Sequence, residues 1–304
     1  MSAPDTDLVL ALDLGGTHLR AGLLAPGVDP AEVADLAAVP APRDLEAFRA
    51  AVDDLLGRAR EHGEVGRIGL TVPGTADGER SLWVPKLHYL DGLVPGDLVG
   101  VPVTVANDAQ LALLAEVTAG AAAGRRDVVL FAVGTGIGSA VMVGGRIVTG
   151  SHGAACSAGW FTQEPDEPGD PSDGWLERHA AGPSFDDAAR RLGRPDVPDG
   201  AALMAAAAGG DPDAQAAVAT PARTLAAAIA ATVALLDPDC ILLAGGVAAA
   251  YPVLEPHVRD VLRRHTPAHL HGVAVEVGRF APRAGLVGAA VAGRRGHLWT
   301  EVEP

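Results

Sequence analysis

Three short segments of the chain carry the residue types from which a phosphoryl-transfer site can be built. They are residues 13–17 (DLGGT), 107–109 (NDA) and 134–138 (GTGIG). Glycine lacks the Cβ that would hold an anion away from backbone N–H groups, so glycine turns can cradle a phosphate. Each segment also has a purely structural interpretation, because glycine pairs form hairpin turns and Asn or Asp caps helices.

Two common nucleotide-binding motifs are excluded by the residues around the second glycine segment. A dinucleotide fingerprint must continue into a helix, whereas residues 140–143 (AVMV) are typical of a strand. The chain also lacks the G-K-[ST] sequence of a Walker loop. Phosphate binding would therefore depend on paired hairpin turns.

The elements that must position these segments follow a repeated pattern. Runs at 7–12 and 19–24 flank the first glycine segment, and runs at 127–132 and 140–143 flank the second. Each unit is typical of a strand, a tight glycine turn and a returning strand. The repeat predicts a duplicated architecture in which each half contributes one glycine turn to a shared site.

Periodicity predicts the remaining elements. We expect helices at 44–61, 109–121, 224–236 and 284–293, and helices that begin near Trp175 and Val247. Short apolar runs predict strands at 67–72, 101–105 and 240–243. We expect 77–97 to be rich in loops, 163–173 to be an exposed loop, and Gly and Pro to break 190–213.

Composition limits the classes of partner. The chain has 304 residues and a formal net charge of −15 at pH 7, which argues against duplex DNA or an anionic membrane as a partner. Its two cysteines cannot form a disulfide framework. No secretory signal pattern is visible, and the longest apolar run, 225–236, is too short for a membrane span. We expect a soluble, cytoplasmic protein that binds neither nucleic acid nor membrane.

Taken together, the segments resemble the phosphate, sugar and adenosine motifs of the ROK family (repressors, open reading frames and kinases). The resemblance is carried, in order, by residues 13–17 (DLGGT), 73–74 (PG), 107–109 (NDA), 134–138 (GTGIG), 150–155 (GSHGAA), 244–247 (AGGV) and 285–290 (GLVGAA). It covers nearly the whole chain and implies an α/β, two-domain actin-like ATPase (ribonuclease H-like) fold with duplicated β-sheet cores. The implied domains are a small one at 1–106, joined by a C-terminal helix at about 285–298, and a large one at 107–284.

The resemblance also implies roles for individual residues. Asp108 is the catalytic base. The implied substrate-binding residues are Asn107, Asp108, Gly74, Ser157, Trp160, Glu177 and His152. The implied nucleotide-binding residues are Asp13, Gly15, Gly16, Thr17, Gly134, Thr135, Gly136, Gly245 and Gly246. Asp13 would act on Mg²⁺ through water, and ATP, a sugar and a second copy of the chain are the implied partners.

The sequence departs from the family pattern at the sugar pocket. Ser157 and Trp160 replace the usual Glu and His, and the usual zinc-binding cysteine cluster is absent, with Glu177 alone retained at its end. Because a structural zinc needs four N or S ligands, we expect no zinc. We expect Trp160 and Trp175 to pack the same region by apolar contact.

The resemblance favours an ATP-dependent hexose kinase that acts at the 6-hydroxyl of glucose or of an amino-hexose such as kanosamine. Polyphosphate is an alternative donor. A second alternative is a degenerate sugar-binding or regulatory protein, which the changes at Ser157 and Trp160 favour and the retained Asp108 opposes. A DNA-binding repressor would need a helix-turn-helix before the first motif, and only twelve residues precede Asp13.

Overall fold

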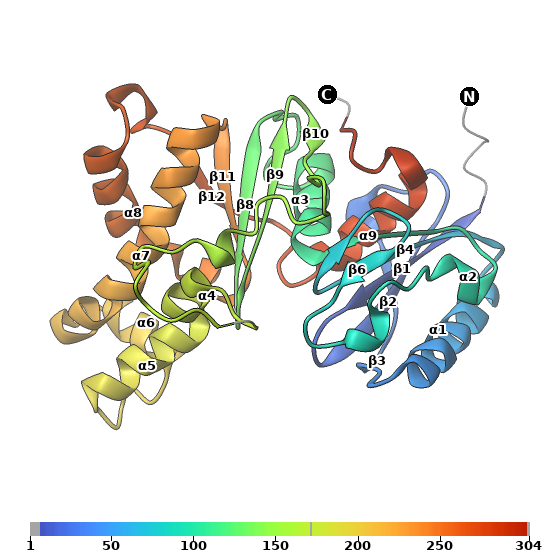
Figure 1. The fold of residues 1–304 in the computed structure, drawn as a ribbon, viewed down its shortest axis with the longest axis horizontal. Helices are drawn as coiled ribbons and strands as arrows, with labels where there is room; N and C mark the ends of the chain where they lie inside the picture. Colours follow the sequence, from blue (N-terminus) through green and yellow to red (C-terminus); the bar gives the residue numbers. More distant parts are fainter. Residues whose placement is uncertain (1–6, 171, 303–304) are drawn as a thin grey trace. The chain divides into compact units, whose positions relative to one another are not determined.

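The computed structural model describes residues 7–170 and 172–302. Among these residues the strands form two five-stranded sheets, ordered β3-β2-β1-β4-β7 and β10-β9-β8-β11-β12, and a short β5-β6 pair (Figure 1). The first sheet contains β1 (Leu8–Leu14), β2 (His18–Leu24), β3 (Ala34–Pro40), β4 (Val65–Val72) and β7 (Val103–Asn107). The second contains β8 (Val128–Val133), β9 (Ile137–Val143), β10 (Arg146–Ile147), β11 (Cys240–Ala244) and β12 (Ala274–Val277). The short pair is β5 (Thr75–Ala76) and β6 (Ser81–Trp83).

Helices connect and cover these strands. The α-helices are α1 (Leu45–Arg60), α2 (Gly96–Val99), α3 (Asp108–Ala119), α4 (Trp175–Ala180), α5 (Gly182–Leu192), α6 (Gly200–Ala208), α7 (Pro212–Leu236), α8 (Tyr251–His265) and α9 (Ala284–Arg295). The 3-10 turns are η1 (Pro30–Glu32), η2 (His88–Leu90), η3 (Ala158–Trp160), η4 (Gly246–Ala250), η5 (Ala268–Leu270) and η6 (Gly296–Leu298).

The two sheets repeat one connection pattern, as the sequence predicted. In the first sheet β1 pairs with β2 in antiparallel and with β4 in parallel direction. In the second, β8 lies between β9 and β11, and β8, β11 and β12 are parallel. In each sheet the middle strand, β1 or β8, is followed by a glycine turn that leads into the antiparallel neighbour, β2 or β9.

The first sheet is held by an aliphatic core against α1. Leu10, Leu12 and Leu70 of the sheet and Phe48 and Leu55 of α1 are at most 1% exposed. Burial of each such side chain stabilises the fold by roughly 1.5–3 kcal/mol. The helix begins after Asp44, whose carboxylate caps it by accepting from Ala47 N–H at 2.8 Å.

Glycines bring α9 into direct contact with the first sheet and with α3. A Cβ on Gly69 of β4 would lie 1.8 Å from the carbonyl oxygen of Ala289. A Cβ on Gly288 would lie 1.8 Å from the carbonyl oxygen of Leu111. Backbones this close exclude any side chain, so α9 packs tightly on both β4 and α3.

This packing determines how the chain divides. The chain forms two compact units. The first consists of Met1–Arg126, Ala140–Ala155 and Pro282–Pro304, and the second consists of Asp127–Ser139 and Cys156–Ala281. We expected a boundary between residues 106 and 107, but α3 packs on α9 and so lies in the first unit. The assignment of functional domains to 1–106 and 107–284 stays a prediction.

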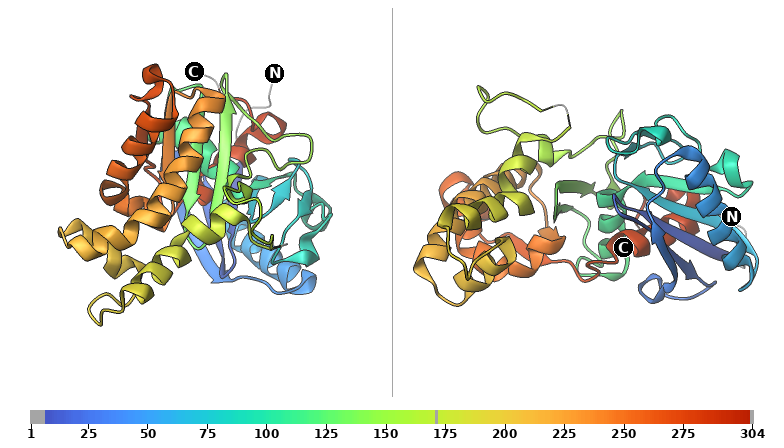
Figure 2. Two further views of the ribbon diagram at one scale, coloured as in Figure 1. Left: turned by 60° about the vertical axis from the view of Figure 1, so that its left-hand side comes forward. Right: turned by 90° about the horizontal axis from the view of Figure 1, so that it is seen from below.

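Helix α7 of the second unit is longer than predicted. We expected a helix at 224–236, but α7 begins at Pro212, where the Asp211 carboxylate accepts from the N–H groups of Asp213 and Ala214. Among the described residues, α7 is the one helix that is long and apolar enough to cross a membrane, judged by length and composition alone. Its most apolar window is 56% buried within the protein, where α4, α5, α6 and α8 contact it (Figure 2). That environment is the one expected of a core helix.

Other differences are local. Strand β3 was not expected, and β5, β6, η2 and α2 lie in the segment 77–97 and beside it, where we expected mainly loops. Helices α5 and α6 occupy much of 190–213, because the glycines at 193 and 200 end and begin helices instead of interrupting one.

Candidate functional site

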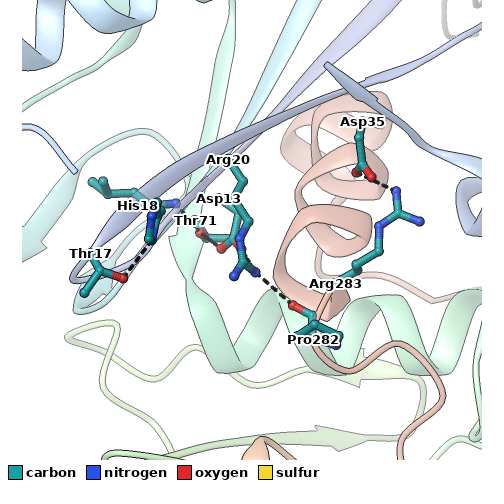
Figure 3. A network of polar contacts seen from close by, with 9 residues as sticks. Asp13, Thr17, His18, Arg20, Asp35, Thr71, Pro282 and Arg283 are labelled. Atoms are coloured by element: carbon teal, nitrogen blue, oxygen red, sulfur yellow. Dashed lines mark hydrogen bonds and ion pairs between the residues drawn. The ribbon is translucent and has the colours of Figure 1, made fainter. Parts of the chain in front are cut away.

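Asp13 lies in the central strand of the first sheet with a partner on each side. The strand register sets it opposite Arg20 of β2 and Thr71 of β4. Thr71 Oγ1 donates to Asp13 Oδ1 at 2.6 Å, and Arg20 Nη1 lies 4.0 Å from Oδ2 (Figure 3). Burial raises the pKa of Asp13, while the Thr71 hydrogen bond and the Arg20 charge oppose that rise. Arg20 also donates to the carbonyl of Pro282 at 3.2 Å.

The first glycine turn faces open space. Gly15 N–H donates to His18 O at 2.9 Å, so this amide closes the hairpin instead of pointing to a ligand. Nothing lies within 4 Å of the Cβ position of Gly16, and Gly16 and Thr17 are exposed. Thr17 Oγ1 lies 3.0 Å from His18 Nδ1. An anion can therefore approach the backbone at Gly16 and Thr17.

Asn107, and not Asp108, is the cap of α3. Its Oδ1 accepts from the N–H groups of Ala109 and Gln110 at 2.9 and 3.2 Å, and its Nδ2 donates to Gly74 O at 2.9 Å. Gly74 is required there, because a Cβ would lie 2.2 Å from Trp83 O. The interpretation of Asp108 as the helix cap is therefore wrong, because Asn107 accepts the hydrogen bonds of the first free N–H groups of α3.

Asp108 is the first residue of α3. One oxygen accepts from Ala109 N–H at 2.8 Å, and the side chain keeps contact with solvent. The surrounding protein nevertheless displaces much of the water that would stabilise its charge, and this desolvation raises its pKa to about 6. The Ala109 hydrogen bond opposes the rise, and the negative charge of Asp13 adds to it. A carboxylate of this pKa can accept and release a proton near neutral pH.

The second glycine turn is held by a residue from α4. Gly134 N–H donates to Gly136 O at 2.9 Å, and Gly182 N–H donates to Gly134 O at 2.7 Å. Ile137 N–H donates to Glu177 Oε2 at 2.7 Å. The sequence placed Glu177 with the substrate-binding residues, and the structure brings its carboxylate against this turn. Within the turn Thr135 is exposed.

The predicted adenosine segment lies beside this second turn. Gly245 has φ +81°, and a Cβ there would lie 2.4 Å from the carbonyl oxygen of Val133, the residue before Gly134. Gly246 is exposed and begins η4. The backbone of this segment comes so close to the end of β8 that only glycine fits at position 245.

Three of the predicted substrate-binding residues, two of which depart from the family pattern, lie at the surface. His152, Ser157 and Trp160 are exposed, and Trp160 keeps 47% of its surface. The expectation that Trp160 packs by apolar contact stays a prediction. Trp175 stacks on His179 with ring centroids 4.3 Å apart, and its Nε1 donates to Glu167 at 2.7 Å, so it packs through a polar contact as well.

Sequence reasoning missed Glu167 and His179. Both lie in or beside the acid-rich segment, whose composition is typical of an exposed loop and does not distinguish one carboxylate from another. In residues 7–170 and 172–302, no group of three or more His, Cys, Asp or Glu side chains is arranged to hold a metal ion. A water-mediated Mg²⁺ fits Asp13, because Mg²⁺ keeps several waters and uses one or two carboxylates plus phosphate oxygens.

Comparison with known proteins identifies the family. The ROK family model matches residues 9–295. The chain is 32% identical over 299 residues to the bifunctional enzyme NanE/NanK of Brucella melitensis, covering 95% of the chain and 54% of that protein. It thus spans about half the length of that relative. It is 32% identical over 295 residues to the N-acetylmannosamine kinase of Shigella flexneri, covering 93% of the chain and 97% of that protein.

A solved structure extends the comparison. A ROK family glucokinase from Streptomyces griseus, in complex with glucose and AMPPNP, superimposes with a TM-score of 0.77 at 26% identity. The match covers 95% of this chain and 100% of that one. It confirms the predicted fold class, an α/β actin-like ATPase fold with duplicated sheets. By the family model, the sequence identity and the fold, this chain belongs to the ROK family.

Proposed function

We propose that the protein is a sugar kinase that transfers the γ-phosphoryl group of ATP to a hexose hydroxyl. The observation that carries the proposal is Asp108, a carboxylate whose pKa is raised to about 6 at the start of a capped helix, beside the Asp13 turn. The kinase names of the relatives and the bound nucleotide analogue of the structural neighbour support the reaction class.

Each residue then has a defined task. Asp108 accepts the proton of the attacking hydroxyl, since a sugar alcohol is a poor nucleophile while protonated. Asn107 fixes the start of α3 and so the direction of the Asp108 side chain. The open backbone at Gly16 and Thr17 in the first unit, and that at Thr135 in the second unit, can each approach phosphate oxygens. A Mg²⁺ ion bound through water to Asp13 would neutralise charge on the phosphates.

We propose as the acceptor the 6-hydroxyl of glucose or of an amino-hexose, with N-acetylmannosamine added by the name of the Shigella relative. Exposed Ser157 and Trp160 stand where the family pattern has Glu and His, so the acceptor pocket is chemically altered. We also propose a cytoplasmic homodimer, as the family resemblance implies.

The test is ADP release by the purified protein with ATP and Mg²⁺. The acceptors are glucose, mannose, fructose, glucosamine, N-acetylglucosamine, N-acetylmannosamine and kanosamine, and polyphosphate replaces ATP in a second series. The matched control is Asp108→Asn, checked for folding by circular dichroism. Turnover with one sugar that disappears in the control supports the proposal. A folded protein that binds a sugar without turnover with either donor favours the degenerate sugar-binding alternative.

A further inference from the structure

The acid-rich segment between η3 and α4 forms a closed loop. Leu176 N–H donates to Phe161 O at 3.1 Å, which ties the two ends together. The ends meet closely, because a Cβ on Gly174 would lie 2.1 Å from Gly159 O. Between these ends most of the described residues are exposed. A loop of this kind needs an internal contact to take one conformation.

Glu167 supplies that contact by reaching three side chains of α4. One oxygen accepts from Trp175 Nε1 at 2.7 Å. The other lies 3.0 Å from His179 Nε2 and 3.2 Å from Arg178 Nη2. The stacked rings of Trp175 and His179 complete the group, which we name the Glu167 clamp: Glu167, Trp175, Arg178 and His179.

Helix α4 presents this clamp on one face and Glu177 on another. Trp175, Arg178 and His179 are spaced by three and four residues, so they share a face of the helix. Glu177 follows Trp175 by two positions and therefore points away from that face. Its carboxylate meets Ile137 N–H at 2.7 Å and lies against Gly136, where a Cβ would come within 2.5 Å.

A six-residue helix has little stability of its own, so its orientation depends on what holds it. The clamp holds one face to the loop, and Glu177 meets the glycine turn from the other. We propose that Glu167 is a positioning residue that fixes α4 and thereby the carboxylate of Glu177 against the 134–138 turn. Its consequence for catalysis rests on the proposed kinase function; its effect on the turn does not.

The chemistry of the clamp requires a carboxylate. Trp175 Nε1 donates to Glu167, the Arg178 guanidinium forms an ion pair with it, and His179 Nε2 lies within hydrogen-bond distance, so all three contacts favour an ionised carboxylate. The hydrogen bond with His179 is the main cause that holds the pKa of Glu167 below its usual range, with further contributions from Trp175 and Arg178. Glutamine would turn an N–H₂ group toward these donors.

The first experiment is hydrogen exchange of the backbone amides in the turn, measured on the full chain without ligand. Glu167→Gln is expected to increase exchange at residues 134–138 on the order of tenfold, because the acceptor of Ile137 N–H becomes mobile. Glu164→Gln, the same change at an exposed position of the same loop, is the control and should leave exchange unaltered. Trp175→Phe keeps the ring and removes one donor, so an intermediate increase is expected. Unaltered exchange in folded Glu167→Gln and Trp175→Phe would overturn the proposal.

The second experiment separates positioning from general stability. In a Glu177→Ala background the acceptor is already gone, so adding Glu167→Gln should change exchange of the Ile137 amide no further. Additive effects would show that Glu167 acts by another route and would refute the proposal. With an active kinase, Glu167→Gln should raise the KM for ATP on the order of tenfold while kcat changes less, a scale typical of supporting residues. If the wild-type protein proves inactive, the kinase function fails while the exchange result still decides the positioning role.

Discussion

The glycine turn after β1 and the glycine turn after β8 share one strand–turn–strand pattern, but the carboxylate beside each turn comes from a different place in the chain. In the first turn, Asp13 belongs to the strand itself, and the hairpin register sets Arg20 opposite it. In the second turn, the carboxylate is that of Glu177, which is separated from Ile137 by forty positions in the sequence. Local register is sufficient in one case, and tertiary packing is required in the other.

This difference has a physical consequence. A cross-strand partner is fixed as soon as the hairpin forms, because residues opposite each other are held a short distance apart by the backbone. Glu177 reaches its turn only when α4 is correctly oriented. We therefore expect the first turn to tolerate changes elsewhere in the fold, and the second to be sensitive to them.

The largest expected effect is at Asp108, whose charge couples to the first turn through Asp13. Asp108→Asn should lower kcat by about 10²–10⁴-fold, the range of general-base catalysis, and should leave sugar binding nearly intact. Steady-state kinetics and calorimetric titration with the sugar measure the two quantities. Unchanged kcat would remove Asp108 from the mechanism.

The second prediction compares alanine at two positions of one turn. Gly136→Ala places a Cβ 2.5 Å from Glu177 Oε2, whereas nothing lies within 4 Å of the Cβ position of Gly134. Gly136→Ala must displace the Glu177 carboxylate and with it the hydrogen bond from Ile137 N–H, so it should lower the free energy of unfolding by about 0.5–1.5 kcal/mol. Gly134→Ala should change it by about 0.5 kcal/mol or less. Denaturant unfolding of both variants checks this, and equal losses would contradict the packing that the structure shows.

The third prediction is a pH dependence caused by the raised pKa of Asp108. Because Asp108 must be ionised to accept a proton and its pKa is about 6, kcat/KM should fall below pH 6, about tenfold per unit. The folded pKa lies above the ordinary value of 3.8, so the folded state binds more protons between these values and loses stability as pH rises through them. The Tm of Asp108→Asn should accordingly rise relative to wild type between pH 4 and pH 7. A difference in Tm that does not vary with pH would contradict the raised pKa.

The smallest expected effect is at Arg20. Its side chain is 45% exposed and lies 4.0 Å from Asp13, so solvent weakens the ion pair. Arg20→Met should lower the free energy of unfolding by about 0.2–1 kcal/mol, the usual range for exposed pairs. Thr71→Val, which removes a buried hydroxyl, should lower it by about 1–3 kcal/mol. If Arg20→Met proved the more destabilising, the ion pair and not the Thr71 hydrogen bond would hold Asp13.

Local patterns determined much of this protein in advance. Apolar runs on both sides of a glycine turn predicted the β1–β2 hairpin, and apolar periodicity predicted α1. Trp175 was correctly expected to begin a helix. The ordered motifs implied the family and the fold, which the comparisons confirmed. The hairpin and helix predictions depend on side-chain spacing within about one element of the chain, whereas the family and fold came from the resemblance of the ordered motifs.

Only the tertiary structure decided which distant segments meet. The sequence predicted Glu177 as a sugar contact without indicating that Ile137 N–H would donate to it, and it did not distinguish Glu167 from its acidic neighbours. The contact that joins α3 to α9, residues far apart in the sequence, is likewise visible only in the tertiary structure, while the predicted functional domains stay a prediction. Composition and periodicity describe how a segment can pack, whereas the partner against which it packs is selected by the shape and the hydrogen-bonding groups of the whole fold.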